Sequence, residues 1–488
     1  MKEKEKLNDT KKNFIYNLIY QILIMIIPLI LSPYLSRTLG ASGVGIYSYT
    51  YSIVYYFMLL TLLGVNNYGN RVVAKVRNNK EELSKSFWGI YTLQLMSGLL
   101  MIIVYYIYIS MSNDKYKTIA LIQSLFIISS IIDINWLFFG LEEFKKTITR
   151  NTIIKIISLL LIIIFVKKPE DTWKYTLIMS TTTILSQAVL WVFVPKYIKF
   201  TKIYKSDIVK HIKPNLILFI PVIAVSLYKI MDKIMLGAIS NINEVAYYEN
   251  AEKLVHVPLT LITALGTVML PKMSNIIANG DKNKIDVYIS KSISFVMFLS
   301  SAMCFGLISI GYDFAPIYFG QSFQKTGILI MLLAMTLPFL AFANVLRMQY
   351  LIPNEKDKEY IISVFLGAII NLIMNIILIP YLESIGACIG TIAAEFIVMF
   401  YQTFSVRKSL NVKQYISNIL PFFIKAFIMF LIIYPMKSLI NNSIICICTQ
   451  VIVGSLIYFL LNIKYIKSIV DLKEYILNLK NKLNIKAR

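Results

Sequence analysis

The sequence predicts an all-α polytopic membrane protein with about 14 transmembrane helices, and its composition and charge distribution are the basis of this prediction. Hydrophobic residues form 57% of the 488-residue chain and charged residues only 15%, whereas about a quarter of a soluble domain is charged. The mean hydropathy is +0.67. With so few charged residues, a soluble fold of this length could not cover its own surface.

Apolar segments long enough to cross a bilayer recur along the whole chain. A transmembrane helix needs about 20 predominantly apolar residues. Fourteen segments meet this need, namely 14–35, 46–65, 87–109, 116–139, 151–166, 175–195, 215–236, 247–270, 288–311, 326–346, 359–380, 386–406, 419–436 and 443–463. The spans 46–65 and 247–270 are the weakest because polar residues stripe them, and 151–166 is short.

The basic residues predict the orientation of these spans. The N-terminus, the C-terminal tail and the even-numbered gaps hold 35 Lys and Arg residues, against 8 in the odd-numbered gaps when Lys117, at the edge of the span 116–139, is counted with them. Because cytoplasmic loops carry the excess of Lys and Arg, both termini are expected in the cytoplasm and the protein in the cell membrane. Orientation also explains the net charge of +23, so we expect no nucleic-acid partner.

Several function classes are excluded at this point. The gaps are too short for a nucleotide-binding domain or a soluble catalytic domain, and no GxxxxGK[ST], GxSxG or HExxH motif occurs in the chain. The four cysteines lie in apolar segments and the chain has only two histidines, without zinc-ligand spacing. We therefore predict no catalytic residue, no metal site and no bound cofactor.

A weak internal repeat predicts how the helices are grouped. Leu39-Gly40 is followed by Tyr47 and Gly64, and Leu236-Gly237 by Tyr247 and Gly266. Two parallel six-helix lobes around a central cavity would explain this order, although chance similarity between apolar segments is an alternative. The predicted parts are an N-lobe (1–213), a C-lobe (214–414), two extra C-terminal helices (415–463) and a basic tail (464–488).

The tail alternates apolar residues with lysines at a spacing of mostly three or four. This pattern is typical of an amphipathic helix on the anionic inner leaflet. A solvated tail that only reinforces the topology is the alternative.

Charged residues inside predicted spans indicate a polar interior. Lys229, Asp232 and Lys233 are spaced to share one helix face. Lys229 is about 6 Å from the middle of its span at 1.5 Å per residue, too deep to reach the interface easily. If Asp232 neutralises one of the lysines, the other still requires an anion or a wet cavity.

Two further spans carry ionisable residues. Glu249, Glu252, Lys253 and His256 follow one stripe of 247–270, so this stripe should line an aqueous path or a buried interface. Glu395 lies almost at the middle of 386–406. Desolvation favours a protonated carboxyl there, which could carry or gate a coupling proton. Pairing with a lysine from another helix is the equal alternative.

The order of these features resembles a known family. The relevant stretches are Tyr34 to Gly40, Gly43 to Tyr47, Asn67 to Gly69, Asp133 to Trp136, Phe139 to Glu142, Asp232 to Gly237, Tyr247 to Lys253 and Asn371 to Pro380. Together they resemble the Wzx-type oligosaccharide flippases of the multidrug/oligosaccharidyl-lipid/polysaccharide exporter superfamily. The resemblance spans the first twelve predicted helices.

The resemblance implies a function. A member would have a V-shaped cavity between its lobes and flip an undecaprenyl-diphosphate-linked oligosaccharide from the inner to the outer leaflet by alternating access, for cell-surface polysaccharide. Membrane lipids and polysaccharide assembly machinery are the implied partners. A diphosphate needs cations, which Arg37, Lys229, Lys233 and Lys253 offer. Asp232, Glu252 and Glu395 are the candidates for coupling or gating, with H+ or Na+ as the coupling ion.

Two other functions are weighed against this one. A cation-coupled drug antiporter of the same fold is disfavoured because the deep lysines repel cationic drugs, and 14–35 lacks the acidic residue typical of that branch. The lipid II flippase branch has arginines in its first helix, and this chain has none before Arg37. A membrane-embedded polysaccharide polymerase would need a sizeable outward loop, whereas the outward gaps are short.

Overall fold

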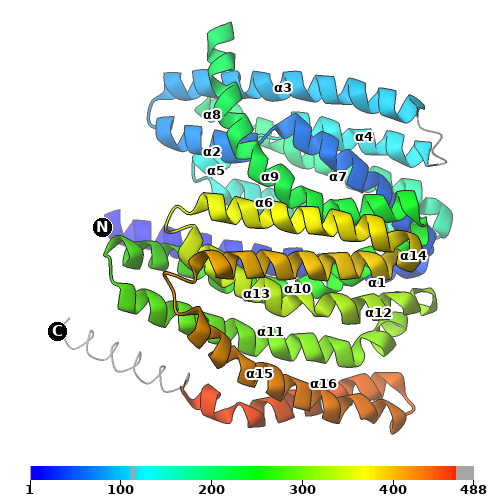
Figure 1. The fold of residues 1–488 in the computed structure, drawn as a ribbon. Coiled ribbons are helices and arrows are strands. Elements are labelled where there is room, and N and C mark those ends of the chain that lie inside the picture. The colour runs from blue at the N-terminus through cyan, green and yellow to red at the C-terminus, as the bar shows by residue number, and fades with distance from the viewer. Residues whose placement is uncertain (1, 112–115, 469–488) are drawn as a thin grey trace. The chain divides into compact units, whose positions relative to one another are not determined.

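The computed structural model describes residues 2–111 and 116–468. In this part of the chain every regular element is helical. The helices, shown in Figure 1, are α1 (Lys2–Leu62), α2 (Val65–Val76), α3 (Lys80–Met111), α4 (Lys117–Ile131), α5 (Asn135–Gly140), α6 (Phe144–Phe165), η1 (Pro169–Asp171), α7 (Thr172–Trp191), α8 (Val194–Tyr197), α9 (Lys205–Ile239), α10 (Ile242–Ala278), α11 (Lys282–Phe319), η2 (Gln321–Phe323), α12 (Gln324–Ala334), α13 (Thr336–Leu346), η3 (Arg347–Leu351), α14 (Asp357–Val406), α15 (Val412–Ile433), η4 (Tyr434–Ser438) and α16 (Ser443–Leu461).

The helices confirm the predicted multi-pass membrane class. Among the described residues, 12 helical segments are long and apolar enough to cross a membrane. Two of them, Ile26–Val76 and Asp357–Val406, each overlap two of the spans expected from the sequence. The difference between 12 segments and 14 expected spans therefore comes from helices that continue through a short break.

The first of these breaks lies in α1. Gly40 has φ 68° and ψ −178°, which is not helical. Glycine adopts positive φ without the steric cost of a Cβ, so it can divide α1 where another residue would be strained. The break falls between the expected spans 14–35 and 46–65.

The second break makes α14 a helical hairpin. Glu383 has φ 51° and ψ −129°. A Cβ at Gly386 would lie 2.7 Å from the Leu378 backbone, and one at Gly390 would lie 2.4 Å from Asn375 Oδ1. Since residues after the break pack in reverse order against residues before it, the two halves run antiparallel. Because Gly386 and Gly390 have no side chain, the two halves of α14 can approach each other closely.

The contacts divide the chain into two compact units. Unit 1 comprises Met1–Lys253 with Ala368–Gly390, and unit 2 comprises Leu254–Gly367 with Thr391–Arg488. Each unit is considered by itself below. The four-part division at 213, 414 and 463 stays a prediction, and the part of the basic tail beyond residue 468 lies outside the described residues.

Each unit has its own apolar core. In unit 1, Phe87, Trp136 and Phe138 are fully buried in one cluster, and Tyr105 and Ile127 belong to a second. In unit 2, the buried side chains of α10, α11, α13 and α15 form one large cluster.

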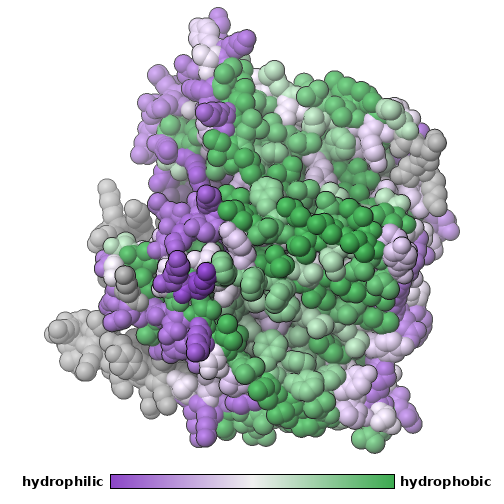
Figure 2. Space-filling model, in the orientation of Figure 1, coloured by the Kyte–Doolittle hydropathy of each residue, from purple (hydrophilic) through white to green (hydrophobic). Residues whose placement is uncertain are grey.

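The outer faces of the helices are also apolar. On α3, Leu99, Leu100, Ile103 and Ile107 are each more than half exposed. Figure 2 shows apolar side chains over the middle of the helices and hydrophilic side chains toward the helix ends. Exposed apolar surface of this extent is what a lipid-facing surface requires.

Candidate functional site

A cluster of four charged residues joins α9 and α10 in unit 1. The Lys233 ammonium lies 2.8 Å from Glu249 Oε2 and 3.2 Å from Glu252 Oε2, and the Lys253 ammonium lies 2.9 Å from Glu249 Oε1. The hydroxyl of Ser48, from α1, donates to Glu249 Oε2 at 2.9 Å. We call Lys233, Glu249, Glu252 and Lys253 the charge cluster. Two cations and two anions balance its charge.

Close packing of α1 on α9 and α10 positions the charge cluster. A Cβ at Gly45 would lie 1.9 Å from the carbonyl oxygen of Ile242, and one at Gly237 would lie 2.1 Å from the Tyr49 ring. Neither position has room for a side chain. These two glycines belong to the stretches that carry the family resemblance, and their role in this structure is to bring the three helices together.

Asp232 is fully buried and has other partners. Its Oδ2 accepts a hydrogen bond of 2.6 Å from the Tyr248 hydroxyl, and its Oδ1 accepts one of 2.6 Å from Asn375 Nδ2. Asn375 Nδ2 also donates to Asn371 Oδ1 at 3.2 Å. Asp232 thus ties α9 to α10 and to the first half of α14. Its expected part in coupling stays a prediction.

Aromatic side chains surround one side of the charge cluster. The ring of Tyr47 stacks on that of Tyr51 at 5.7 Å and meets that of Tyr175 at 4.5 Å. A small pocket next to them is lined by Tyr47, Ser48, Tyr175, Glu249 and Lys253, among others. Polar groups from α1, α7 and α10 therefore face one another inside unit 1.

The cations expected to bind substrate differ in exposure. Lys229 is exposed, and across the residues that the structure describes its ammonium has no ion pair. Arg37 is exposed, and the Lys253 side chain is 41% exposed. The Lys233 side chain is only 13% exposed and has two carboxylate neighbours. The charge of Lys233 is thus compensated within the protein, whereas that of Lys229 is open to an anion.

The structure brings some of the expected residues together. Lys233, Glu252 and Lys253 belong to the charge cluster, which adds Glu249. Glu395 is buried in the second half of α14 and belongs to unit 2. The roles assigned to all seven site residues stay predictions. Within the described ranges, no group of three or more His, Cys, Asp or Glu side chains is arranged to hold a metal ion.

A polar pocket in unit 1 was not expected from the sequence. It has a volume of about 510 Å³ and is lined by α2, α5, α6 and α7. Its walls are Asn66, Asn67, Asn70, Asp133, Asn135, Phe139, Arg150, Asn151, Ile154, Lys155, Ser158, Met179, Thr182, Thr183, Ser186 and Gln187. Six carboxamides among these residues give the pocket its character. We call it the amide pocket.

Arg150 organises one wall of the amide pocket. It is 6% exposed, and its guanidinium donates to Asn135 Oδ1 at 3.0 Å, to Asn151 Oδ1 at 3.1 Å and to the carbonyl oxygen of Ser186 at 2.9 Å. A further bond of 3.3 Å reaches Gln187 Oε1. Because a guanidinium only donates, it fixes each amide with its oxygen toward Arg150.

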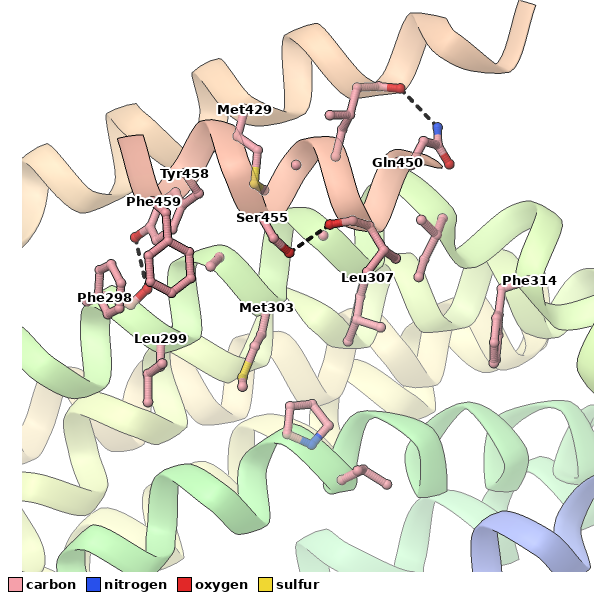
Figure 3. Close-up of a pocket in the computed structure, with 18 of the residues that line it drawn as sticks. Phe298, Leu299, Met303, Leu307, Phe314, Met429, Gln450, Ser455, Tyr458 and Phe459 are labelled. Carbon is pink, nitrogen blue, oxygen red and sulfur yellow. Dashed lines mark hydrogen bonds between the residues drawn. The ribbon is translucent and has the colours of Figure 1, made fainter. Parts of the chain in front are cut away.

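An apolar pocket of similar volume lies in unit 2, between α10, α11, α15 and α16 (Figure 3). Its volume is about 510 Å³, and Leu299, Met303, Leu307, Phe314 and Met429 are among its walls. Its few polar side chains are bonded to backbone carbonyls. Gln450 donates to Ile433 O at 3.0 Å, Ser455 to Val451 O at 2.7 Å and Tyr458 to Phe298 O at 2.9 Å.

Known proteins resemble this chain in sequence. Residues 10–277 match the family described as polysaccharide biosynthesis protein. A "Putative O-antigen transporter" of Escherichia coli K12 is 23% identical over 409 residues, which cover 82% of this chain and 97% of that protein. A "Probable low-salt glycan biosynthesis flippase" of Haloferax volcanii is 22% identical over 239 residues, which cover 49% of this chain and 50% of that protein.

Solved structures resemble it in fold. The lipid II flippase MurJ in an inward closed conformation has a TM-score of 0.76 and 17% identity, with 94% of this chain and 99% of that chain covered. An inward-facing multidrug resistance transporter of the MATE family has a TM-score of 0.57 and 13% identity, with 80% and 99% covered. These structures confirm the predicted fold class, an all-α polytopic membrane protein. Since the family match covers more than half of the sequence, the chain belongs to the polysaccharide biosynthesis protein family.

Proposed function

We propose that the chain is a flippase that moves an undecaprenyl-diphosphate-linked oligosaccharide from the inner to the outer leaflet of the cell membrane, by alternating access, for cell-surface polysaccharide. The family match over residues 10–277 is the observation that carries this proposal. The near full-length likeness to an O-antigen transporter and the flippase fold support it.

The chemistry of such a substrate explains the polar groups inside the helices. A diphosphate and a glycan must pass a hydrocarbon layer of about 30 Å, where unsolvated polar groups are costly. A protein that carries them must replace water with its own donors, acceptors and cations. The charge cluster and the amide pocket supply these groups within membrane-crossing helices.

In this proposal Lys229, Lys253 and Arg37 attract the diphosphate, because they are the exposed cations among the seven candidates. Lys233 holds Glu249 and Glu252 in place. Asp232, Glu252 and Glu395 remain the candidates for coupling transport to H+ or Na+. The apolar pocket accommodates part of the polyprenyl chain.

The proposal includes an orientation and partners. Both termini face the cytoplasm, where the lipid-linked oligosaccharide is made, and the protein works beside the polysaccharide assembly machinery. Reporter fusions at Ser240 and Asn442, both in expected outward gaps, should report the outer side. A cytoplasmic signal at both positions would overturn the orientation.

Two alternatives are less well supported. A drug antiporter of the same fold would have to bind cations next to an exposed Lys229. A polymerase would require catalytic residues on a large outward loop, and the relatives reported above are transporters or flippases by name.

Depletion of the protein in growing cells tests the proposal. The lipid-linked oligosaccharide should accumulate in the inner leaflet, and renewed expression of the chain should clear it. If this lipid accumulates instead in the outer leaflet, the missing step follows flipping and a polymerase is favoured. Export of a cationic dye without any change in the lipid pool would favour the drug antiporter.

A further inference from the structure

We infer that the amide pocket of unit 1 binds a sugar residue of the transported glycan. This inference rests on the proposed function and names a subsite for the part of the substrate that the charge cluster does not recognise. The pocket is separate from Asp232 and from all four residues of the charge cluster, none of which lines it.

The first argument is the kind of polar group in the pocket. Carboxamides offer both donors and acceptors without a charge, and sugar hydroxyls also donate and accept. Six carboxamides and four hydroxyls line the pocket. A site built for a phosphate alone would present mainly cations and backbone amides. The guanidinium of Arg150 is instead used to hold neighbouring amides.

The second argument is that one wall is rigid and presents a donor. Gln187 Oε1 accepts hydrogen bonds from Arg150 and, at 3.1 Å, from Asn135 Nδ2. Its Nε2 must therefore point the other way. Asn135 is itself held, because its Nδ2 also donates to Asp133 Oδ1 at 2.7 Å. A preorganised donor of this kind adds to affinity since little entropy is lost on binding.

The third argument is that three further amides line the pocket from another helix, α2. Asn66, Asn67 and Asn70 lie at the start of α2, and Asn70, four residues from Asn66 and three from Asn67, shares a face with each of them. All three line the pocket. Within the described part of the chain their side chains take part in no hydrogen bond with the protein, so they are available to a ligand.

The fourth argument is an aromatic ring in the same pocket. Phe139 lines it and is 38% exposed, and its ring stacks on that of Phe144 at 6.0 Å. A sugar ring has apolar C–H faces beside its hydroxyls. Sites for small molecules combine an apolar or aromatic surface with a few placed polar groups, and Phe139 provides that surface among the amides.

The position of the pocket along the helices fits the direction of transport. Asn66 follows the second predicted span, Asn135 ends the fourth, and Arg150 precedes the fifth. These three positions are all at the cytoplasmic side in the predicted topology. A glycan that arrives from the inner leaflet would thus meet the amide pocket on the side from which it enters.

Binding measured with and without the glycan tests this inference. The full chain is purified and reconstituted in nanodiscs. The two probes are the lipid-linked oligosaccharide extracted from depleted cells and undecaprenyl diphosphate, which has no sugar. The double variant Asn67→Ala/Asn70→Ala should bind the first probe roughly tenfold more weakly. It should bind the second probe within twofold of the unchanged chain. Phe139→Ala should show the same selectivity.

A matched control uses an amide outside the pocket. Asn78 is exposed just beyond the end of α2 and does not line the pocket, so Asn78→Ala should bind both probes normally. Thermal unfolding of each variant verifies that the fold is intact. If the double variant and Phe139→Ala bind both probes equally weakly, the pocket holds the diphosphate or supports the fold, and the inference is wrong. Unchanged binding of the oligosaccharide probe would also overturn it.

The same experiment separates this inference from the proposed function. If the unchanged chain does not bind the lipid-linked oligosaccharide more tightly than undecaprenyl diphosphate, glycan recognition itself is absent. In that case both the proposed function and the inferred sugar subsite are wrong. If the unchanged chain does discriminate but the pocket variants discriminate equally well, the proposed function stands and only the subsite is refuted.

Discussion

The amide pocket of unit 1 and the apolar pocket of unit 2 have the same volume, about 510 Å³ each, but opposite chemistry. In the first, a buried guanidinium holds Gln187 and Asn135 by their amide oxygens, and three more carboxamides line the pocket from α2. In the second, Gln450, Ser455 and Tyr458 are bonded to backbone carbonyls, so the walls that remain are apolar. The proposed substrate has a polar and an apolar part, and one chain offers a site for each.

The two pockets differ in how their polar side chains are bonded. In the unit 2 pocket, Gln450, Ser455 and Tyr458 donate to backbone carbonyls, while Gln450 Oε1 is buried without a hydrogen-bond partner among the described residues. In the amide pocket of unit 1, Arg150, Asn135 and Gln187 bond to one another, whereas the side chains of Asn66, Asn67 and Asn70 remain available to a ligand. Asn66 and Asn67 are exposed and Asn70 is half-buried, so water can bond to these amides until a ligand replaces it.

The largest effect is expected from Arg150. Replacing it with Met removes the donors that hold Asn135, Asn151 and the Ser186 carbonyl. Several acceptors then lose a charged donor, and the free energy of unfolding should fall by about 3 kcal/mol or more. Arg150→Lys should be intermediate because an ammonium cannot reproduce the planar fork. Thermal unfolding in detergent measures both. Equal stability of Arg150→Met would mean that the amides hold their positions without Arg150.

The next largest effect is expected from substitutions of Lys229, an exposed cation of unit 1. Lys229→Glu should abolish most flipping, Lys229→Ala should reduce affinity roughly tenfold or more, and Lys229→Arg should retain part of the activity. The physical reason is the lost attraction for the diphosphate. Flipping and membrane abundance are measured together, and all three variants should reach similar abundance.

The rival explanation is that Lys229 only neutralises Asp232. It predicts that Lys229→Ala lowers the protein level and that adding Asp232→Ala restores it. In the structure Asp232 accepts hydrogen bonds from Tyr248 and Asn375, so removal of Asp232 should instead be harmful by itself. Full rescue of flipping by the double variant would exclude a direct role of Lys229 with the substrate.

The sequence predicted those features that depend on residues close together in the chain. The membrane spans were predictable because each depends on an uninterrupted apolar segment, and the breaks at Gly40 and Glu383 fall in expected gaps. The stripe of Glu249, Glu252 and Lys253 was predictable from helical periodicity. Their pairing with Lys233 was not, because it depends on how α10 packs against α9.

The amide pocket could not be predicted from the sequence, because its residues come from separate helices. Asn135 lies in one of the stretches that carry the family resemblance, but Asn70 and Gln187 carry no signal in their own helices, and only the fold brings α2, α5, α6 and α7 together around them. The same holds for Asp232 and Asn375, which are 143 residues apart in sequence and 2.6 Å apart in space. Asn371 and Asn375 are four residues apart and share one helix face, but no sequence signal assigns them a partner on α9.

A smaller effect is expected in the apolar pocket. A Cβ at Gly306 would meet no atom within 4 Å, so Gly306→Leu should fill part of the pocket without disturbing the helix. Excluding part of a polyprenyl chain should weaken binding of undecaprenyl diphosphate by less than the ~0.8 kcal/mol per CH2 that burial from water gives, because the displaced groups return to lipid. Gly306→Ala is the matched control and should bind almost normally. Normal binding by Gly306→Leu would show that the chain of the lipid lies elsewhere.

The smallest effect is expected from the Tyr458 hydroxyl. The side chain is 3% exposed, its ring stacks on Phe298 at 5.2 Å, and its hydroxyl donates to the Phe298 carbonyl. Tyr458→Phe keeps the ring and loses one neutral hydrogen bond, so the free energy of unfolding should fall by about 1 kcal/mol. Tyr458→Ala, which also removes the ring, should cost about 3–5 kcal/mol. Because the hydroxyl is engaged with the backbone, Tyr458→Phe should bind undecaprenyl diphosphate as well as the unchanged chain does. A selective loss of binding, with stability unaltered, would mean that the hydroxyl contacts the ligand, and the contrast between the two pockets would then be smaller than the geometry indicates.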